Sequence, residues 1–485
     1  MRKMGVVLAS AALALGALFL GSYAGPASSM RKAKAQTVPP QPNIVFILTD
    51  DMRKDDLAYM PKTKALLQSE GMTFRNAFVS NPICCPSRAT IMRGEYAHNT
   101  QVWSNIDGST GGWAAYNSGG YENDNVATRL QAAGYRTALI GKYLNHYHEA
   151  TKPPGWDKWF ATLDPTTFNY FNYDINNNGT VTHFGSRDSD YKTDVIRRQT
   201  RSFIGASANQ PEPFFAYVAP IAPHLPSTPA PRDRHAFDGI QGPRLPSFNE
   251  QDVSDKPSWI SQKPRLTATQ IANIDKRHEN RVESLRAVDD LVEGVINELK
   301  NDGALSNTYV FFTSDNGYHL GEHRIGLGKR TAYEEAVRVP LAVRGPGVPA
   351  GASAKEMSLN IDFAPTFAEL AGVSVPEFVD GRSLVPLLSG ASPATWRSAF
   401  LIEHWSGGGG QPLETPSYAG IRNETHKYVE YDTGEKELYD LSSDPYELQS
   451  FPEGIDPALL DGFSSRLESL KDCAGQTCRE AEDTP

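Results

Sequence analysis

The segment that decides the fold reads NIVFILTDD and spans residues 43–51. Its first part, 43–48, is an apolar run of strand length that lacks the alternation of a half-exposed strand. Such a run is typical of a strand that is buried on both faces of a sheet. The run leads directly into Thr49, Asp50 and Asp51, so we expect carboxylates at the carboxyl end of a central strand.

The same arrangement of an apolar run and a polar ending recurs along the chain. The runs are 309–312 before Thr313-Ser314-Asp315-Asn316-Gly317, 214–218 before the segment that reaches His224, and 136–140 before Gly141 and Lys142. Open parallel sheets place their ligands just beyond the carboxyl ends of their strands. The sequence therefore predicts a functional site built from these polar endings.

Helical patterns alternate with the strand-like runs. Residues 124–133 are followed by Gly134, and residues 269–300 carry an apolar stripe on one face. This alternation predicts an α/β fold, in which helices flank a buried, mostly parallel central sheet.

Beyond residue 390 the pattern changes to short strand-like runs at 399–403, 418–421 and 428–431. We therefore expect a large catalytic domain at 43–390. A smaller C-terminal α+β domain with a short antiparallel sheet is expected at 391–485.

Composition excludes several classes of protein. Of the 485 residues, 39% are hydrophobic and 21% are charged, which is typical of a globular chain and not of a disordered one. The net charge is -10 and the chain has no basic block, so we expect no nucleic-acid partner.

The N-terminus has the pattern of a secretory signal peptide, which we assign to residues 1–24. Two basic residues precede an apolar segment at 4–20, and small residues stand at the two positions of 22–24 that a signal peptidase reads. We expect cleavage after Ala24, a linker at 25–42 and a secreted or extracytoplasmic protein without stable membrane insertion. An uncleaved membrane anchor is the alternative.

The four cysteines form two pairs. Cys473 and Cys478 close a short loop, and in an exported protein a local disulfide is the favoured interpretation, with free thiols as the alternative. Cys84 and Cys85 are adjacent, so a disulfide between them would be strained. We expect Cys85 to be a buried, apolar thiol.

Two segments are expected near a cleft. Residues 220–264 contain nine prolines, and a long irregular segment of this kind is usually functional or wraps the surface. Residues 406–410 include four consecutive glycines, and we expect them to form a loop of the smaller domain. A third segment, 174–185, resembles the start of an EF-hand, but Asn178-Gly179 between apolar residues favours a hairpin instead.

The sequence CCPSRAT at 84–90 begins a predicted helix, with Pro86 at its first position. Cys84 would then lie just before a helix N-terminus, where backbone N–H groups favour an anion. The segment Cys84-x-Pro86-Ser87-Arg88, with Thr90 and Gly94 behind it, resembles the signature of the type I sulfatases of the alkaline-phosphatase-like superfamily. In that family the motif cysteine is oxidised to formylglycine.

The resemblance extends over nearly the whole mature chain. The features that follow the family order are Asp50-Asp51, Gly141-Lys142, His224, Asp315-Asn316-Gly317 and Lys329-x-Thr331-x-Tyr333-Glu334. It implies a sulfuric ester hydrolase in which one hydroxyl of the hydrated aldehyde attacks sulfur and the other expels sulfate.

The resemblance also implies roles for individual residues. Oxygen ligands from Asp50, Asp51, Asp315 and Asn316 suit one Ca²⁺ ion, and matured residue 84 would complete the metal site. Lys142 and Lys329 would bind sulfate oxygens, and Arg88 would hold the formylglycine. His224 would donate a proton to the leaving alcohol or contact sulfate.

One position departs from the common arylsulfatase pattern. Leu144 stands where many members carry histidine, which leaves the base for sulfate elimination open. The segment Gly141-Lys142-Tyr143-Leu144-Asn145 and the doubled cysteine resemble the subgroup of N-acetylglucosamine-6-sulfatases and heparan-type endosulfatases. Asn145 and His319 are candidates for substrate binding, with His323 as a further candidate at the rim.

The expected substrate is a sulfated small molecule or a sulfated sugar, and the maturation partner is a formylglycine-generating enzyme. Two alternatives stay open. One is a phosphoester or phosphonate monoester hydrolase on the same fold, which paired kinetics on sulfate and phosphate esters would distinguish. The other is an inactive sugar-binding homologue, which would carry unmodified Cys84.

Overall fold

The computed structural model describes residues 41–406, 415–451 and 453–484. The predicted signal peptide, all but the last two residues of the predicted linker, and the glycine run at 407–410 lie outside these ranges. The described residues belong to one compact unit. Within them, no helix is both long and apolar enough to cross a bilayer.

The centre of the unit is a mixed sheet of ten strands, counted over the described ranges. In spatial order its strands are β13 (Ala352–Ala354), β2 (Met72–Phe74), β12 (Leu341–Arg344), β9 (Thr308–Ser314), β1 (Asn43–Thr49), β8 (Phe214–Ala219), β4 (Arg136–Gly141), β5 (Lys158–Thr162), β6 (Tyr173–Asn177) and β7 (Thr180–Phe184). Two small ribbons, β3 (Ala77–Phe78) with β14 (Ser358–Leu359) and β10 (His319–Leu320) with β11 (Leu327–Gly328), lie outside it.

The four apolar runs of the sequence form the middle of this sheet, and they are parallel neighbours in the order β9, β1, β8 and β4. Thr49 pairs with Ser314, and Gly141 pairs with Ala219. The carboxyl ends of these strands therefore lie side by side, as the polar endings predict.

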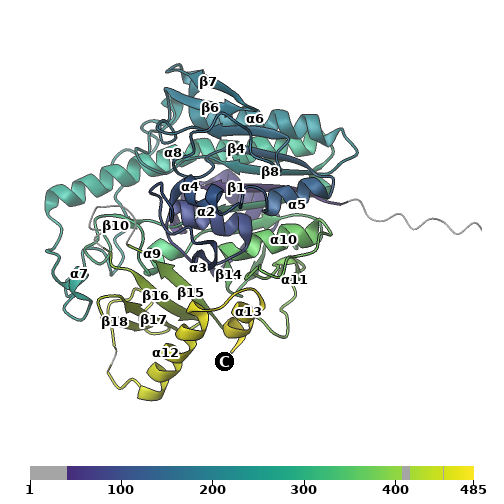
Figure 1. The fold of residues 1–485 in the computed structure, drawn as a ribbon. Helices are drawn as coiled ribbons and strands as arrows, with labels where there is room; N and C mark the ends of the chain where they lie inside the picture. The colour runs from purple at the N-terminus through teal and green to yellow at the C-terminus, as the bar shows by residue number, and fades with distance from the viewer. Residues whose placement is uncertain (1–40, 407–414, 452, 485) are drawn as a thin grey trace, which may run out of the picture. The chain divides into compact units, whose positions relative to one another are not determined.

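Helices cover both faces of the sheet (Figure 1). The α-helices of the described residues are α1 (Pro61–Thr63), α2 (Cys84–Arg93), α3 (Ala97–Thr100), α4 (Gly112–Ser118), α5 (Val126–Ala132), α6 (Lys192–Ala208), α7 (Ser258–Ser261), α8 (Ala268–Asn301), α9 (Glu334–Val337), α10 (Phe363–Leu370), α11 (Val385–Leu388), α12 (Pro457–Lys471) and α13 (Gln476–Asp483). Of these, α12 and α13 contact the C-terminal sheet and not the central one.

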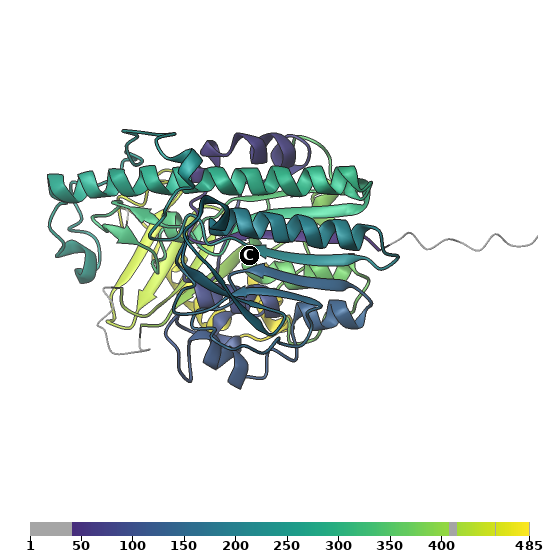
Figure 2. The same cartoon turned by 90° about the horizontal axis from the view of Figure 1, so that it is seen from above.

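Alternate side chains of β1 divide the core into two layers. Phe46 belongs to the cluster that contains residues of α2, α5 and α10. Val45 and Ile47 belong to the cluster that contains residues of α6 and α8. Figure 2 shows α6 and α8 lying side by side along one face of the sheet. Because both faces are covered, the middle residues of β1, such as Val45, Phe46 and Ile47, are apolar on both sides of the strand.

Helix boundaries follow the capping residues. The Thr267 side chain caps α8, which agrees with the predicted helix at 269–300. The predicted start of the other helix at 124 is two residues early, because Asn125 caps α5 with its side chain and Thr128 completes the capping box. Asn178 and Gly179 adopt positive φ between β6 and β7, so the predicted hairpin is confirmed.

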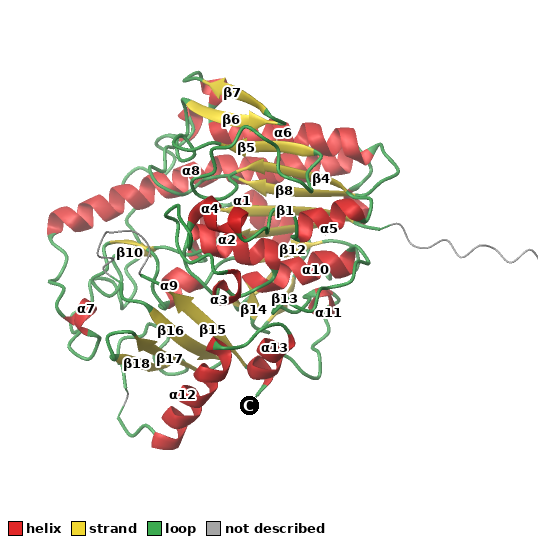
Figure 3. Cartoon of the chain, in the orientation of Figure 1, coloured by secondary structure: helices red, strands yellow, loops and turns green. Residues whose placement is uncertain are grey.

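A separate four-stranded antiparallel sheet forms the small C-terminal domain (Figure 3). Its strands follow one another as β15 (Ala399–His404), β16 (Tyr418–Asn423), β17 (His426–Tyr431) and β18 (Lys436–Asp440). The predicted architecture of a large α/β domain with a smaller C-terminal sheet is confirmed. The boundary at residue 390 stays a prediction.

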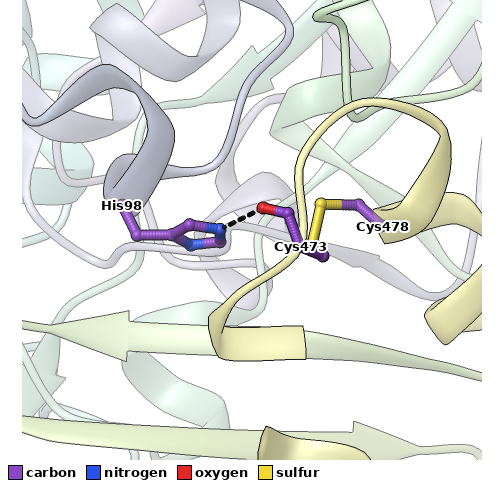
Figure 4. A group of neighbouring side chains, drawn as sticks. All are labelled: His98, Cys473 and Cys478. Carbon is purple, nitrogen blue, oxygen red and sulfur yellow. Dashed lines mark hydrogen bonds between the residues drawn. A yellow bond between two sulfur atoms is a disulfide. The ribbon is translucent and has the colours of Figure 1, made fainter. Parts of the chain in front are cut away.

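The C-terminal loop is joined to the large domain through a histidine (Figure 4). Cys473 and Cys478 form a disulfide, and Nε2 of His98 lies 2.9 Å from the carbonyl oxygen of Cys473. The other ring nitrogen of His98 lies 3.0 Å from a carboxylate oxygen of Glu403. Burial opposes the charge on this imidazole, but Glu403 raises the pKa of His98 to about 9.

We expect His98→Gln to destabilise the protein in a pH-dependent way. The folded pKa of about 9 exceeds the ordinary value of 6.5, so the stabilisation is complete below the unfolded pKa and is lost as pH rises through the folded pKa. The loss in unfolding free energy is about 2 to 3 kcal/mol near pH 6 and close to zero near pH 10. Urea unfolding of both proteins at the two pH values measures it. An equal loss at both would contradict the ion pair.

Candidate active site

The polar strand endings converge at one edge of the central sheet. Asp50 and Asp51 follow β1, Asp315 follows β9, and Lys142 follows β4. All four side chains are buried. His224, at the end of the segment after β8, is partly exposed, and its Nε2 lies 3.7 Å from Asp51 Oδ2.

Two unusual backbone conformations orient these side chains. Asp51 has a φ of 67°, and its N–H donates to Asp315 Oδ1 at 3.1 Å, so the chain turns sharply where the strand ends. Gly141 has a φ of 122°, and a Cβ there would lie 2.1 Å from the carbonyl oxygen of Ala219. Only glycine fits this close approach, which brings Lys142 into the site.

Cys84 is the first residue of α2, and Ile83 is the N-cap. The predicted register, with Pro86 at the first helical position and Cys84 before the helix, is therefore wrong. Proline lacks an N–H, but none of the first-turn N–H groups has an intrahelical partner, so Pro86 is tolerated at the third position. Cys84 still lies at the positive end of the helix.

The thiol of Cys84 lies at the centre of the site and is fully buried. Its Sγ is 3.2 Å from Asp50 Oδ1, 3.7 Å from Asp51 Oδ1 and 2.7 Å from Lys329 Nζ. Burial, followed by the charge of Asp50, raises the pKa of Cys84 well above its ordinary value. The sulfur is therefore a neutral thiol and not a thiolate nucleophile at neutral pH.

Three cations face the three carboxylates. Lys142 Nζ is 2.7 Å from Asp50 Oδ2, Arg88 Nε is 2.8 Å from Asp315 Oδ2, and Lys329 pairs with Asp51. Burial alone would favour the neutral form of Asp50, but Lys142, followed by His224, holds its pKa well below the ordinary range.

The carboxylates also form a set of oxygen donors for a metal ion. Asn316 Nδ2 donates to Asp51 Oδ1 at 2.7 Å, while Asn316 Oδ1 is buried and has no hydrogen-bond partner within the described part of the chain. Burial, followed by the nearby charge of Asp50, raises the pKa of Asp315 to about 6 although Arg88 pairs with it, so Arg88 compensates the charge of this carboxylate only in part. A partly compensated carboxylate and an orphaned amide oxygen fit a hard divalent cation.

His224 is held so that one ring nitrogen faces the carboxylates. Its Nδ1 lies 2.7 Å from the carbonyl oxygen of Leu225, which only accepts, so Nδ1 carries the proton and Nε2 faces Asp51. Burial lowers the pKa of His224 below its ordinary value.

An aromatic side chain that was not predicted from the sequence supports two site residues. The rings of Phe168 and His224 are stacked with centroids 4.1 Å apart, and Lys142 Nζ lies 4.8 Å from the centre of the Phe168 ring. Phe168 lies in the loop between β5 and β6, where no motif marks it. Arg281 of α8 was also missed, and it donates to the carbonyl oxygen of Asp51 at 2.6 Å.

The residues predicted to bind substrate are buried, and each has a different environment. Asn145 is buried, and its Oδ1 has no hydrogen-bond partner among the described residues. His319 is fully buried and lies 2.7 Å from the Thr331 hydroxyl, and His323 is buried against Glu250. A cavity lies over the site, and neither histidine belongs to its described wall. The predicted position of these histidines at the rim of the substrate site is therefore corrected.

A cavity of about 390 Å³ opens over Asp51 and His224. Lys329 and Arg330 line it, together with Trp259 from the proline-rich segment. The prediction that the segment 220–264 borders a cleft is therefore confirmed, although Trp259 itself lies in the short helix α7, which was not predicted.

Two family models match the chain. The sulfatase model matches residues 42–373, and the model for the C-terminal part of N-sulphoglucosamine sulphohydrolase matches residues 321–469.

Similar proteins include an N-acetylglucosamine-6-sulfatase from Capra hircus, which is 36% identical over 482 residues, or 90% of this chain and 85% of the relative. An extracellular sulfatase from Drosophila melanogaster is 40% identical over 377 residues, which cover 75% of this chain and 33% of the relative. A solved structure in complex with its substrate D-glucosamine-2-N,6-O-disulfate has a TM-score of 0.73 and 25% identity, covering 91% of this chain and 99% of that chain.

Proposed function

Since this chain belongs to the sulfatase family of sulfuric ester hydrolases, we propose that it removes the 6-sulfate of a glucosamine-type sugar by means of formylglycine formed from Cys84. Two similar proteins support this substrate class. The relative from Capra hircus is named an N-acetylglucosamine-6-sulfatase, and the solved complex contains D-glucosamine-2-N,6-O-disulfate as its substrate. One observation carries the proposal. Cys84 lies at a helix N-terminus between Asp50 and Lys329, beneath a cavity that is wide enough for a sugar.

The cations of the site are suited to a sulfate ester. Sulfate oxygens repel an anionic nucleophile, so a site that cleaves them must neutralise charge around sulfur. Lys142 and Lys329 lie beside the two carboxylates that contact Cys84, and their ammonium groups bind sulfate oxygens in this proposal. In this proposal the leaving oxygen takes the Nε2 proton of a doubly protonated His224, while the Nδ1 proton stays on the carbonyl oxygen of Leu225.

Residue 84 is matured by a formylglycine-generating enzyme in this proposal. The hydrated aldehyde supplies an oxygen nucleophile and a second hydroxyl that lets sulfate leave. Arg88 is fully buried and donates to Asp315 and to the carbonyl oxygen of Lys142, so it fixes the walls around residue 84.

The donor set of Asp50, Asp51, Asp315 and Asn316 holds Ca²⁺ in this proposal. The ion would acidify the hydrate of residue 84 and neutralise a sulfate oxygen. Asp315 contributes a carboxylate that its neighbours cannot replace, because Asp50, Asp51 and Asp315 each pair with a cation of their own.

We expect Asp315→Ala to lose bound calcium together with activity. Elemental analysis of the purified variant, after dialysis against a calcium buffer, measures the metal independently of turnover. The wild-type protein should hold one ion per chain and the variant about tenfold less at the same free calcium. A variant that keeps its calcium but is inactive would assign Asp315 a different role.

We expect Phe168→Ala to lower kcat/KM about 5- to 30-fold, because stacking on His224 and the contact with Lys142 are both lost. Phe168→Tyr keeps the ring and should retain most of the activity. Kinetics across the pH range test the positioning role, since a misplaced His224 alters the pH profile. An unchanged profile and kcat/KM in Phe168→Ala would exclude that role.

The direct test of the activity is a paired assay on N-acetylglucosamine-6-sulfate and N-acetylglucosamine-6-phosphate. We expect kcat/KM for the sulfate ester to exceed that for the phosphate ester by at least about 100-fold. A preference for the phosphate ester would favour the phosphoesterase alternative. Binding of both sugars without turnover would favour an inactive sugar-binding homologue.

The cellular location belongs to the same proposal. The signal-like pattern at residues 1–24 and the extracellular sulfatase among the relatives support a secreted protein. The proposed division into a catalytic domain at 43–390 and a smaller domain at 391–485 places residues of both domains beside the cavity, since Thr415 belongs to its wall.

A further inference from the structure

A second cavity, of about 400 Å³, lies against the C-terminal sheet. Its walls include four aromatic side chains, which are Trp103, Trp405, Tyr418 and Tyr431. Trp103 comes from the loop after α3 of the large domain, and its ring centroid lies 6.3 Å from that of Trp405. Both domains therefore form this cavity, and none of the residues assigned to the reaction above lies in its wall.

His404 is a buried polar side chain in the wall of this cavity. The residue is only 3% exposed, and neither of its ring nitrogens has a hydrogen-bond partner within the described ranges. Burial, together with the positive charge of Arg330, lowers the pKa of His404 to about 3, so the ring is neutral. A neutral imidazole offers one donor and one acceptor, which matches a hydroxyl group that both accepts and donates. The unmet hydrogen bonds carry a free-energy cost that such a ligand would remove.

The charge of the cavity argues against a sulfated occupant. Asp432 and Asp472 line it, and neither carboxylate forms an ion pair with another described residue. Lys471 also lines it, but its ammonium group pairs with Glu468 at 2.7 Å. Glu403 and Glu430 also line it, paired with His98 and Lys436. Aromatic walls bury the apolar face of a ring, while carboxylates accept hydrogen bonds from hydroxyl or amino groups. These properties suit a sugar ring that carries no sulfate.

The second cavity adjoins the cavity over Cys84. Trp259 lines the first cavity and Tyr431 the second, and their ring centroids are 6.1 Å apart. Thr415 lines the first cavity and Ser417 the second, two residues along the chain. Arg330 lines the first cavity and its charge acts on His404 in the second. One ligand with two linked rings can therefore lie across both.

We propose that the cavity formed by Trp103, His404, Trp405, Tyr418 and Tyr431 is a subsite for an unsulfated sugar unit linked to the unit whose sulfate is removed. The preferred substrate is then an oligosaccharide and not a free monosaccharide. This inference rests on the proposed function, since it names the neighbour of the 6-sulfated sugar.

The test compares two substrates, N-acetylglucosamine-6-sulfate and a chitobiose whose one sulfate is the 6-sulfate at the scissile position. The measured quantity is the ratio of kcat/KM for the disaccharide to kcat/KM for the monosaccharide. We expect Trp405→Ala and His404→Phe each to lower this ratio about tenfold, because one stacking contact or one buried hydrogen-bonding group is lost. His404→Phe keeps the aromatic volume, so a folding defect in Trp405→Ala does not remove the test. Tyr446→Ala, an exposed aromatic outside both cavity walls, is the matched control and should leave the ratio unchanged.

Binding of unsulfated chitobiose, measured by calorimetry, separates this inference from the proposed function. Binding to the wild-type protein that is lost in Trp405→Ala supports the subsite whether or not either sulfate ester is hydrolysed. Failure of both esters to release sulfate contradicts the proposed function alone. Turnover with an unchanged ratio in both variants, or equal chitobiose binding by wild type and Trp405→Ala, overturns the subsite. A chitobiose sulfated on both units that is processed as fast as the singly sulfated one would also overturn it.

Discussion

Cys84→Ser is expected to abolish sulfate release while leaving the fold intact. A serine hydroxyl can occupy the space of the thiol between Asp50 and Lys329, so the core packing changes little. An ordinary hydroxyl lacks the second oxygen that expels sulfate from the modified residue, so turnover should fall by at least about 1000-fold, or about 4 kcal/mol. Ion chromatography of released sulfate measures the loss, and the thermal unfolding midpoint checks the fold.

The neighbouring thiol provides the control for this experiment. Cys85 is equally buried and packs in the apolar cluster behind the site. Cys85→Ala should keep near-wild-type turnover, with some loss of stability from the missing sulfur. Loss of turnover in Cys85→Ala with retention in Cys84→Ser would reverse the assignment of the two cysteines.

Lys329→Ala is expected to raise KM and lower kcat, with a loss in kcat/KM of about 30- to 1000-fold. The ammonium group contacts both Cys84 and Asp51, so it faces sulfate before and during transfer. A buried charge-assisted contact of this kind is worth about 2 to 4 kcal/mol. Lys329→Arg should restore little activity, because a planar guanidinium does not fit where a compact ammonium fits.

Lys355→Ala is the control for the Lys329 variants, since Lys355 is exposed on the surface. The fraction of residue 84 that is matured must be equal in all variants before their rates are compared. Unchanged kinetics in Lys329→Ala would remove Lys329 from the site.

The central strands and most of the site were predictable because their signals are local. An apolar run that ends in Asp50-Asp51 or Asp315-Asn316 specifies both a covered strand and the polar group at its end. The start of α2 was placed too late because proline is compatible with any position of a first helical turn. The strand β18 was missed because three of its five residues are charged, and no sequence signal marked Glu437 as buried.

Tertiary contacts explain what the sequence could not predict. Glu437 is buried because its carboxylate accepts hydrogen bonds from Tyr333, Tyr431 and Tyr439, which come from three separate segments. Phe168 acquires its role only when the β5–β6 loop folds over His224. No spacing along the chain reports such pairings, so these residues emerge only from the folded structure.

The most direct test of the account is the mass of the tryptic peptide 76–88, NAFVSNPICCPSR, after alkylation with iodoacetamide. This peptide contains both Cys84 and Cys85. The account predicts a single alkylated cysteine, at residue 85, and a residue 84 that is about 18 Da lighter than cysteine, as expected for an aldehyde in place of the thiol. Fragment ions that show alkylated cysteine at both positions, in a preparation that hydrolyses N-acetylglucosamine-6-sulfate, would contradict it.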